Sequence, residues 1–196
     1  MSAAALTLAV VIGAATPPGR LSRAAAALAD AARAARPDLR VSMVDLAAAP
    51  VEICDGRPED AYGEATRAAI RAVREASAVA IASPVYRASY PGVLKNLVDL
   101  LPVEALAGKP VGILAMGATA HHYLGVDTQL RAVLAWFGAL VAPTSVYLTS
   151  RDFEHGELTA AAAVEDVRAL ARTLVALAER VAGVTLGPAP LAARTR

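Results

Sequence analysis

The chain has little of what several large classes of protein depend on. It contains one cysteine and three histidines in 196 residues. The single cysteine, Cys54, excludes a disulfide within the chain and fits a reducing compartment, so we expect a cytoplasmic protein. The acidic neighbours Glu52 and Asp55 disfavour a thiolate, which makes Cys54 a poor candidate for a catalytic thiol.

Strong charge and long apolar runs are also missing. A formal net charge of +1 gives no electrostatic basis for binding nucleic acid. No apolar run reaches the roughly 18 residues that a membrane-spanning helix needs. The apolar stretch 6–15 has no basic segment before it, so we interpret it as a strand rather than a signal peptide.

Several catalytic and nucleotide-binding patterns are absent as well. There is no Gly-x-Ser-x-Gly elbow of a hydrolase and no Walker A lysine of a nucleoside triphosphatase. Gly13 and Gly19 are six residues apart with two prolines between them, which does not match the Gly-x-Gly-x-x-Gly of a dinucleotide site. His121 and His122 are adjacent, but no third ligand at a suitable spacing supports a metal site.

What the chain does contain is a regular alternation of strand-like and helix-like segments. We expect strands over 6–13, 40–46, 78–82, 110–116 and 140–147, and helices over 21–36, 64–76, 90–101, 119–137 and 158–181. This alternation predicts an α/β fold: a flavodoxin-like three-layer sandwich whose five-stranded parallel sheet has the order 2-1-3-4-5. We expect a single domain over residues 1–182 and a flexible C-terminal tail over 183–196.

Sheets of this kind bind ligands outside the carboxyl ends of their strands. The first loop at that edge, 13–23, leads into a helix whose N-terminus favours phosphate. Thr16 and Ser22 add hydroxyl groups and Arg20 adds charge. Taken alone, this loop fits an ordinary capped helix start equally well.

The second loop has the most informative composition. Pro84 and Pro91 stiffen it, while Tyr86 and Tyr90 offer surfaces on which a flat ring can stack. Gly92 permits a close approach of the backbone. These residues suit a planar ligand with polar edges.

The sequence from Ser83 to Pro102, SPVYRASYPGVLKNLVDLLP, resembles the NAD(P)H-dependent FMN reductases of the flavodoxin-like fold. The resemblance is closest to the branch that supplies reduced FMN to sulfonate monooxygenases. It implies FMN and NADPH (or NADH) as cofactors, and hydride transfer from nicotinamide to FMN without a dedicated catalytic acid or base. It also implies a possible partner monooxygenase that uses the reduced flavin.

The resemblance identifies which residues we expect to bind the flavin. In the first loop Arg20 and Ser22 stand where the related reductases have Arg and Ser, whereas Ala14 replaces the usual serine and Thr16 a common arginine. In the third loop, 116–124, the relatives carry Thr-Gly-Gly-x-x-x-His-Leu, and Ala118 replaces the second glycine. The expected flavin-binding residues are Thr16, Arg20, Ser22, Ser83, Pro84, Val85, Tyr86, Gly117, Ala118, Thr119 and His122.

The segment 126–134 tracks a helix that carries the subunit contact in those enzymes, so we expect a homodimer or homotetramer. Thr128 stands where part of the sulfonate branch has an interface aromatic. Two other functions stay open at this point. One is a quinone or azo reductase with FMN as a prosthetic group, and the other is a flavodoxin-type electron carrier, which the near-neutral charge disfavours.

Overall fold

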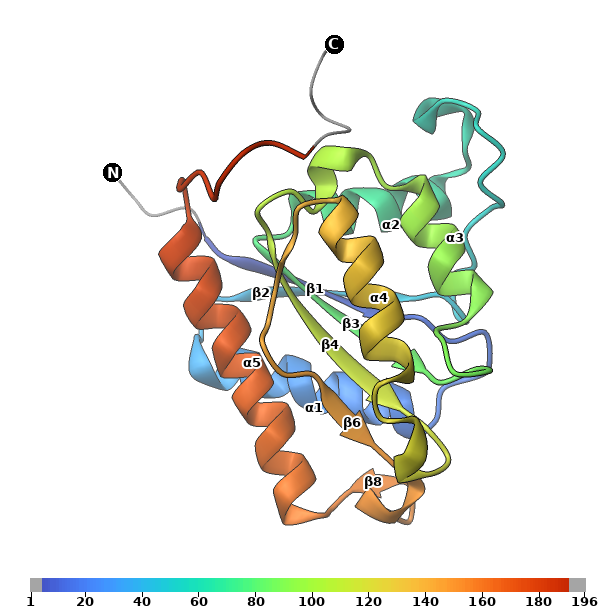
Figure 1. Ribbon diagram of the computed structural model, residues 1–196, viewed down its shortest axis with the longest axis vertical. Helices are drawn as coiled ribbons and strands as arrows, with labels where there is room; N and C mark the ends of the chain where they lie inside the picture. The colour runs from blue at the N-terminus through green and yellow to red at the C-terminus, as the bar shows by residue number, and fades with distance from the viewer. Residues whose placement is uncertain (1–4, 191–196) are drawn as a thin grey trace.

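The computed structural model describes residues 5–190, in which a parallel sheet lies between two layers of helices (Figure 1). The strands are β1 (Thr7–Ile12), β2 (Arg40–Asp45), β3 (Ala78–Pro84), β4 (Pro110–Met116), β5 (Leu140–Val141), β6 (Val146–Leu148), β7 (Phe153–Glu154) and β8 (Glu157–Leu158). The main helices are α1 (Arg20–Ala35), α2 (Glu64–Glu75), α3 (Gly92–Leu100), α4 (Gly125–Trp136) and α5 (Ala161–Val181). Short 3-10 turns cover Glu59–Ala61, Val103–Ala105, Ala120–His122 and Ser150–Asp152.

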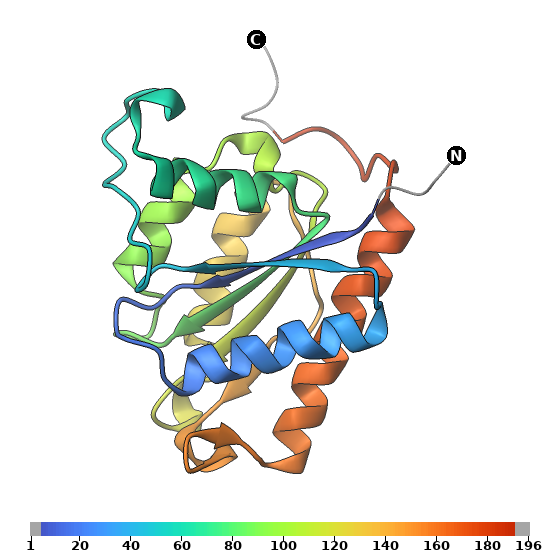
Figure 2. The same cartoon turned by 180° about the vertical axis from the view of Figure 1, so that it is seen from behind.

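The order of the sheet is β2-β1-β3-β4-β5, with every neighbouring pair parallel, so the predicted flavodoxin-like order is confirmed. Helices α1 and α5 cover one face, and α2, α3 and α4 cover the other (Figures 1 and 2). The central strands are therefore buried on both faces, which is why they appear in the sequence as continuous apolar runs.

Alternate side chains of β1 pack against the helices on opposite faces of the sheet. Leu8, Val10 and Ile12 pack toward α1 and α5, whereas Ala9 and Val11 pack toward α2, α3 and α4. All five are at most 4% exposed. A shift of one residue would exchange the two sets between unequal layers, so this packing fixes the register.

The expected fifth strand, 140–147, is wrong as one continuous strand. Two short strands share that position: β5 pairs with the start of β4, and β6 pairs with its end. Pro143, between them, has no N–H to donate to a ladder. Arg131 of α4 holds the segment between β5 and β6 in place. Its guanidinium donates to the carbonyls of Ala142 (2.9 Å) and Pro143 (3.1 Å) and to the carboxylate of Asp127 (2.8 Å).

Two predicted helices begin later than expected. The segment 119–137 becomes an α-helix only at Gly125, and the last helix begins at Ala161 because Leu158 pairs with Phe153 in the β7–β8 hairpin. Of the tail expected over 183–196, residues 183–190 contain no helix or strand, and 191–196 lie outside the described residues. Within 5–190 no helix is both long and apolar enough to cross a membrane.

Candidate functional site

A cavity of about 470 Å³ opens where β1, β3 and β4 end. The register brings these ends together, because Ile12 lies beside Ala82 and Pro84 lies beside Met116. The walls come from the β1–α1, β3–α3 and β4–α4 loops, with Ser150 added from the segment after β6. This is the position at which open α/β sheets bind ligands.

The β1–α1 loop forms a cradle for an anion. Within residues 5–190, the N–H groups of Ala14 to Thr16 and of Arg20 to Ser22 have no hydrogen-bond partner. Gly19 begins the helix without a side-chain cap, and the first turn contains no acidic residue. The guanidinium of Arg20 is exposed and has no ion pair in the described part of the chain. Free amides, the helix dipole and one cation together favour a phosphate group.

The β3–α3 loop forms a rigid wall. Val85 donates its N–H to the carbonyl of Met116 at 2.8 Å, which ties this loop to the end of β4. Tyr86 and Ser89 then exchange two backbone hydrogen bonds, at 2.7 and 3.0 Å, and close a two-residue turn. The central residues of this turn, Arg87 and Ala88, have φ of 51° and 62°, the left-handed conformation that such turns require and that side chains disfavour.

The Tyr86–Ser89 turn lies against the start of α4. A Cβ atom on Gly125, the first residue of α4, would lie 3.0 Å from the carbonyl oxygen of Ala88. Glycine at this position therefore lets the start of α4 lie directly against the backbone of the turn.

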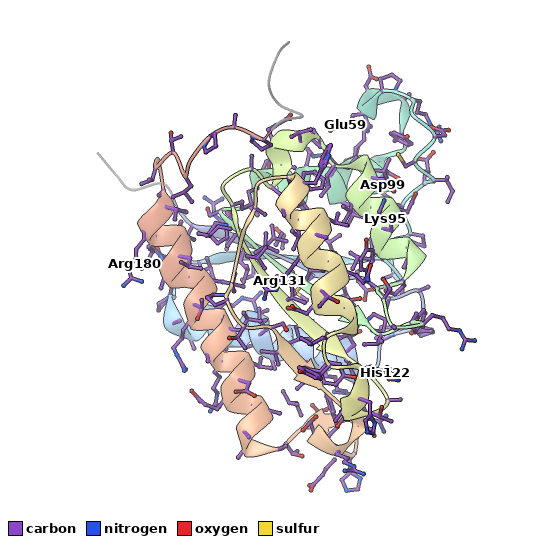
Figure 3. The ribbon with its side chains drawn as sticks, in the orientation of Figure 1. Glu59, Lys95, Asp99, His122, Arg131 and Arg180 are labelled. Carbon is purple, nitrogen blue, oxygen red and sulfur yellow. The ribbon has the colours of Figure 1, made fainter. Side chains whose placement is uncertain are left out.

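Eight of the eleven residues expected from the sequence line the cavity: Thr16, Arg20, Ser22, Pro84, Val85, Tyr86, Gly117 and Ala118. Three do not. Ser83 is fully buried, and its hydroxyl donates to the carbonyl of Pro84 at 3.0 Å. Thr119 and His122 lie outside the lining, and His122 is exposed on the short helix before α4 (Figure 3).

Ser150 is the lining residue that sequence reasoning missed most clearly. It begins a short 3-10 turn in which Thr149 and Asp152 cap one another. A Thr-x-x-Asp pattern directly after the last strand of the sheet was the available signal.

The lining contains no carboxylate, histidine or lysine, so these walls favour binding over proton transfer. Among residues 5–190 no group of three or more metal-binding side chains is clustered. The volume falls within the roughly 300–1,000 Å³ of small-molecule sites. With an anion cradle at one end and Pro84, Val85, Tyr86 and Met116 as flat apolar walls, the cavity fits a planar ring that carries a phosphate.

Comparison with known proteins agrees with this geometry. The family model described as NADPH-dependent FMN reductase matches residues 6–154. An NAD(P)H-dependent FAD/FMN reductase of Geobacillus thermodenitrificans is 39% identical over 140 residues, which cover 71% of this chain and 76% of the relative. The NADH-dependent FMN reductase SfnF of Pseudomonas putida is 30% identical over 176 residues, covering 90% and 95%.

A solved oxidoreductase from Corynebacterium diphtheriae superposes with a TM-score of 0.76 at 27% identity, covering 89% of this chain and 97% of that one. A flavodoxin from an archaeon, at 11% identity and a TM-score of 0.63, shares the fold. The chain therefore belongs to the NADPH-dependent FMN reductase family and uses FMN with NADPH or NADH.

Proposed function

We propose that this protein reduces FMN in the cavity between its three loops and releases the reduced flavin to a partner monooxygenase. The single observation that carries the proposal is the meeting of a free helix N-terminus with a flat apolar slot in one cavity. We assign FMN binding to the eight lining residues expected from the sequence, with Ser150 as an addition.

Different loops bind different parts of the flavin. The free amides of the β1–α1 loop and the guanidinium of Arg20 hold the phosphate, and the hydroxyl of Ser22 adds a donor. Pro84, Val85 and Tyr86 cover the ring from the β3–α3 side, and Gly117 and Ala118 border it from the β4–α4 side. Tyr86 is 44% exposed, which leaves part of its ring free to contact the nicotinamide.

Bound in this cavity, FMN would supply the redox chemistry, which is hydride transfer from the nicotinamide ring. The protein orients the two rings and excludes water, and no side chain of the lining has to donate or remove a proton.

The exposure of the phosphate-binding loop favours release of the flavin. Thr16, Gly19 and Arg20 are all exposed, and the only cation of the lining is Arg20. Few buried side chains fix the phosphate, which favours exchange over permanent retention. A flavin that leaves after reduction is the form that a separate monooxygenase requires, and the 83–102 segment resembles reductases with that role. We place this exchange in the cytoplasm, in keeping with the single cysteine.

We also propose that α3 and α4 form the interface of a homodimer or homotetramer. A groove of about 460 Å³ runs between these helices, lined by apolar residues with Lys95 and Asp99 at its edge. Trp136, which lines this groove, is 55% exposed. A large exposed apolar side chain beside an apolar groove is typical of a subunit contact.

The test is oxidation of NADPH and NADH by desalted protein, followed by the loss of nicotinamide absorbance, with and without added FMN. Turnover that requires FMN and saturates with it supports the proposal. Turnover by a yellow protein without added FMN would instead identify a prosthetic flavin and favour quinone or azo reduction. FMN binding without oxidation would favour an electron carrier.

A further inference from the structure

The β4–α4 loop is held from an unexpected direction. Its residues Gly117 and Ala118 line the cavity, but the loop is held in place by β6, the short strand that follows Pro143. Two contacts do this. Gly117 donates its N–H to the carbonyl of Leu148 at 3.0 Å, and the hydroxyl of Tyr147 donates to the carbonyl of Thr119 at 2.7 Å.

The hydroxyl of Tyr147 occupies the space that a side chain at position 117 would need. A Cβ atom on Gly117 would lie 1.9 Å from the Tyr147 hydroxyl oxygen and 2.9 Å from the ring carbon that carries it. Glycine at 117 and tyrosine at 147 are therefore matched to one another, and the tyrosine reaches Thr119 only because residue 117 has no side chain.

Two backbone donors stay free next to this contact, and one of them belongs to Ala118, which lines the cavity. The N–H groups of Ala118 and Thr119 have no hydrogen-bond partner within residues 5–190. Because the Thr119 carbonyl is tied to Tyr147, these two amides are held in one arrangement rather than left to rotate with a loose loop. Pre-ordered donors bind more tightly because less conformational freedom is lost on binding.

We propose that Tyr147 is a positioning residue of the flavin site: it holds the 117–119 segment so that the free amide of Ala118, which lines the cavity, meets the edge of the flavin ring. The inference rests on the proposed function, because the ligand of this cavity is taken to be FMN. Burial raises the pKa of the Tyr147 hydroxyl, so this group keeps its proton and remains a donor at neutral and mildly alkaline pH.

The test is Tyr147→Phe in the full chain, with FMN affinity measured by quenching of flavin fluorescence. Loss of one hydrogen bond that orders the loop should weaken FMN binding by roughly three- to tenfold. The KM for FMN should rise by the same factor while kcat at saturating FMN changes little. The visible absorption band of bound FMN should shift, because the hydrogen bonds at its ring edge change.

The matched control is Tyr62→Phe. Tyr62 also donates its hydroxyl to a partner, the carboxylate of Asp55 at 3.1 Å, but it lies in the β2–α2 connection and does not line the cavity. This variant should lose a similar amount of stability and keep wild-type FMN affinity. Equal affinities of Tyr147→Phe and the wild type would overturn the positioning role while leaving the proposed function intact. Equal weakening in both variants would also overturn it, since the effect would then be general. A wild-type protein that binds no FMN would refute the proposed function and this inference together.

Discussion

Gly125 and Gly92 offer a paired test of how the site is supported. Each is the first residue of a helix, α4 and α3 respectively, and neither has a positive φ. Alanine at Gly92 would meet no atom within 4 Å, whereas alanine at Gly125 would lie 3.0 Å from the carbonyl oxygen of Ala88 and 3.2 Å from its carbonyl carbon. The same substitution at the same helix position thus enters open space in one case and the backbone of the Tyr86–Ser89 turn in the other.

The magnitude follows from two opposing effects. Replacing a helical glycine by alanine stabilises a protein by at most about 1 kcal/mol, and both variants share this gain. Forcing an extra carbon against packed backbone costs about 1–3 kcal/mol, and only Gly125→Ala bears this cost. We therefore expect the free energy of unfolding of Gly125→Ala to lie about 1–3 kcal/mol below that of Gly92→Ala.

The assay is denaturant unfolding of both variants and the wild type, with FMN affinity measured on the same samples. Gly125→Ala should also bind FMN more weakly, because the displaced turn carries Tyr86 away from the cavity. Gly92→Ala should bind FMN as the wild type does. Equal unfolding free energies for the two variants, or unchanged FMN affinity in Gly125→Ala, would refute the idea that α4 supports the turn.

Three further predictions follow from the site, the groove and the far end of the sheet. Arg20→Ala should weaken FMN binding by roughly three- to tenfold in a fluorescence titration. The control is Arg40→Ala, which removes an exposed arginine that has no ion pair in the described chain and should leave FMN affinity unchanged. Equal FMN affinity in Arg20→Ala and the wild type would show that Arg20 does not bind the phosphate. Trp136→Glu should convert the oligomer to a monomer in light scattering, and an unchanged mass would exclude the α3–α4 face as the interface. Lys109 donates to the carbonyls of Val73 and Arg74 in the last turn of α2. Burial lowers the pKa of Lys109 to about 8 in the folded protein, against about 10.4 in an unfolded chain. Between these values the unfolded chain binds the extra proton, so the contribution of Lys109 to the free energy of unfolding should rise with pH. This contribution should be complete above the pKa of the unfolded chain, about 10.4, and lost as the pH falls to about 8. If the free energy of unfolding of Lys109→Met rose with pH over this range as it does in the wild type, the assignment to Lys109 would be contradicted.

The sequence predicted more of the central sheet than of its edge. β1, β3 and β4 are buried on both faces, so each appears as a short apolar run, and the length of these runs favours strands over helices. The fifth position was harder, because Pro143 stands inside an otherwise plausible strand. Only the fold shows that the chain resumes as β6 beside the other half of β4, held there by Arg131. The single-domain boundary at residue 182 stays a prediction.

The candidate site divides in the same way. The prolines and tyrosines of the second loop indicated a site for a planar ligand, whereas the first loop, taken alone, fitted a phosphate site and an ordinary helix start equally well. His122 was expected at the flavin on a motif position, yet the helix starts later than the pattern suggested and leaves it exposed. Ser150 lines the cavity, but the Thr-x-x-Asp pattern around it indicates a capped turn and not a ligand.

By itself, the sequence determined the alternation of strands and helices, the parallel sheet and the loops at its carboxyl edge, because burial on both faces and helix periodicity are local properties of the chain. Tertiary structure alone decided which residues of those loops meet. The contacts between Gly117 and Tyr147 and between Gly125 and Ala88 join segments 30 and 37 residues apart. Such contacts depend on the absence of a side chain at one position and the presence of an atom at another, and no local pattern records that pairing.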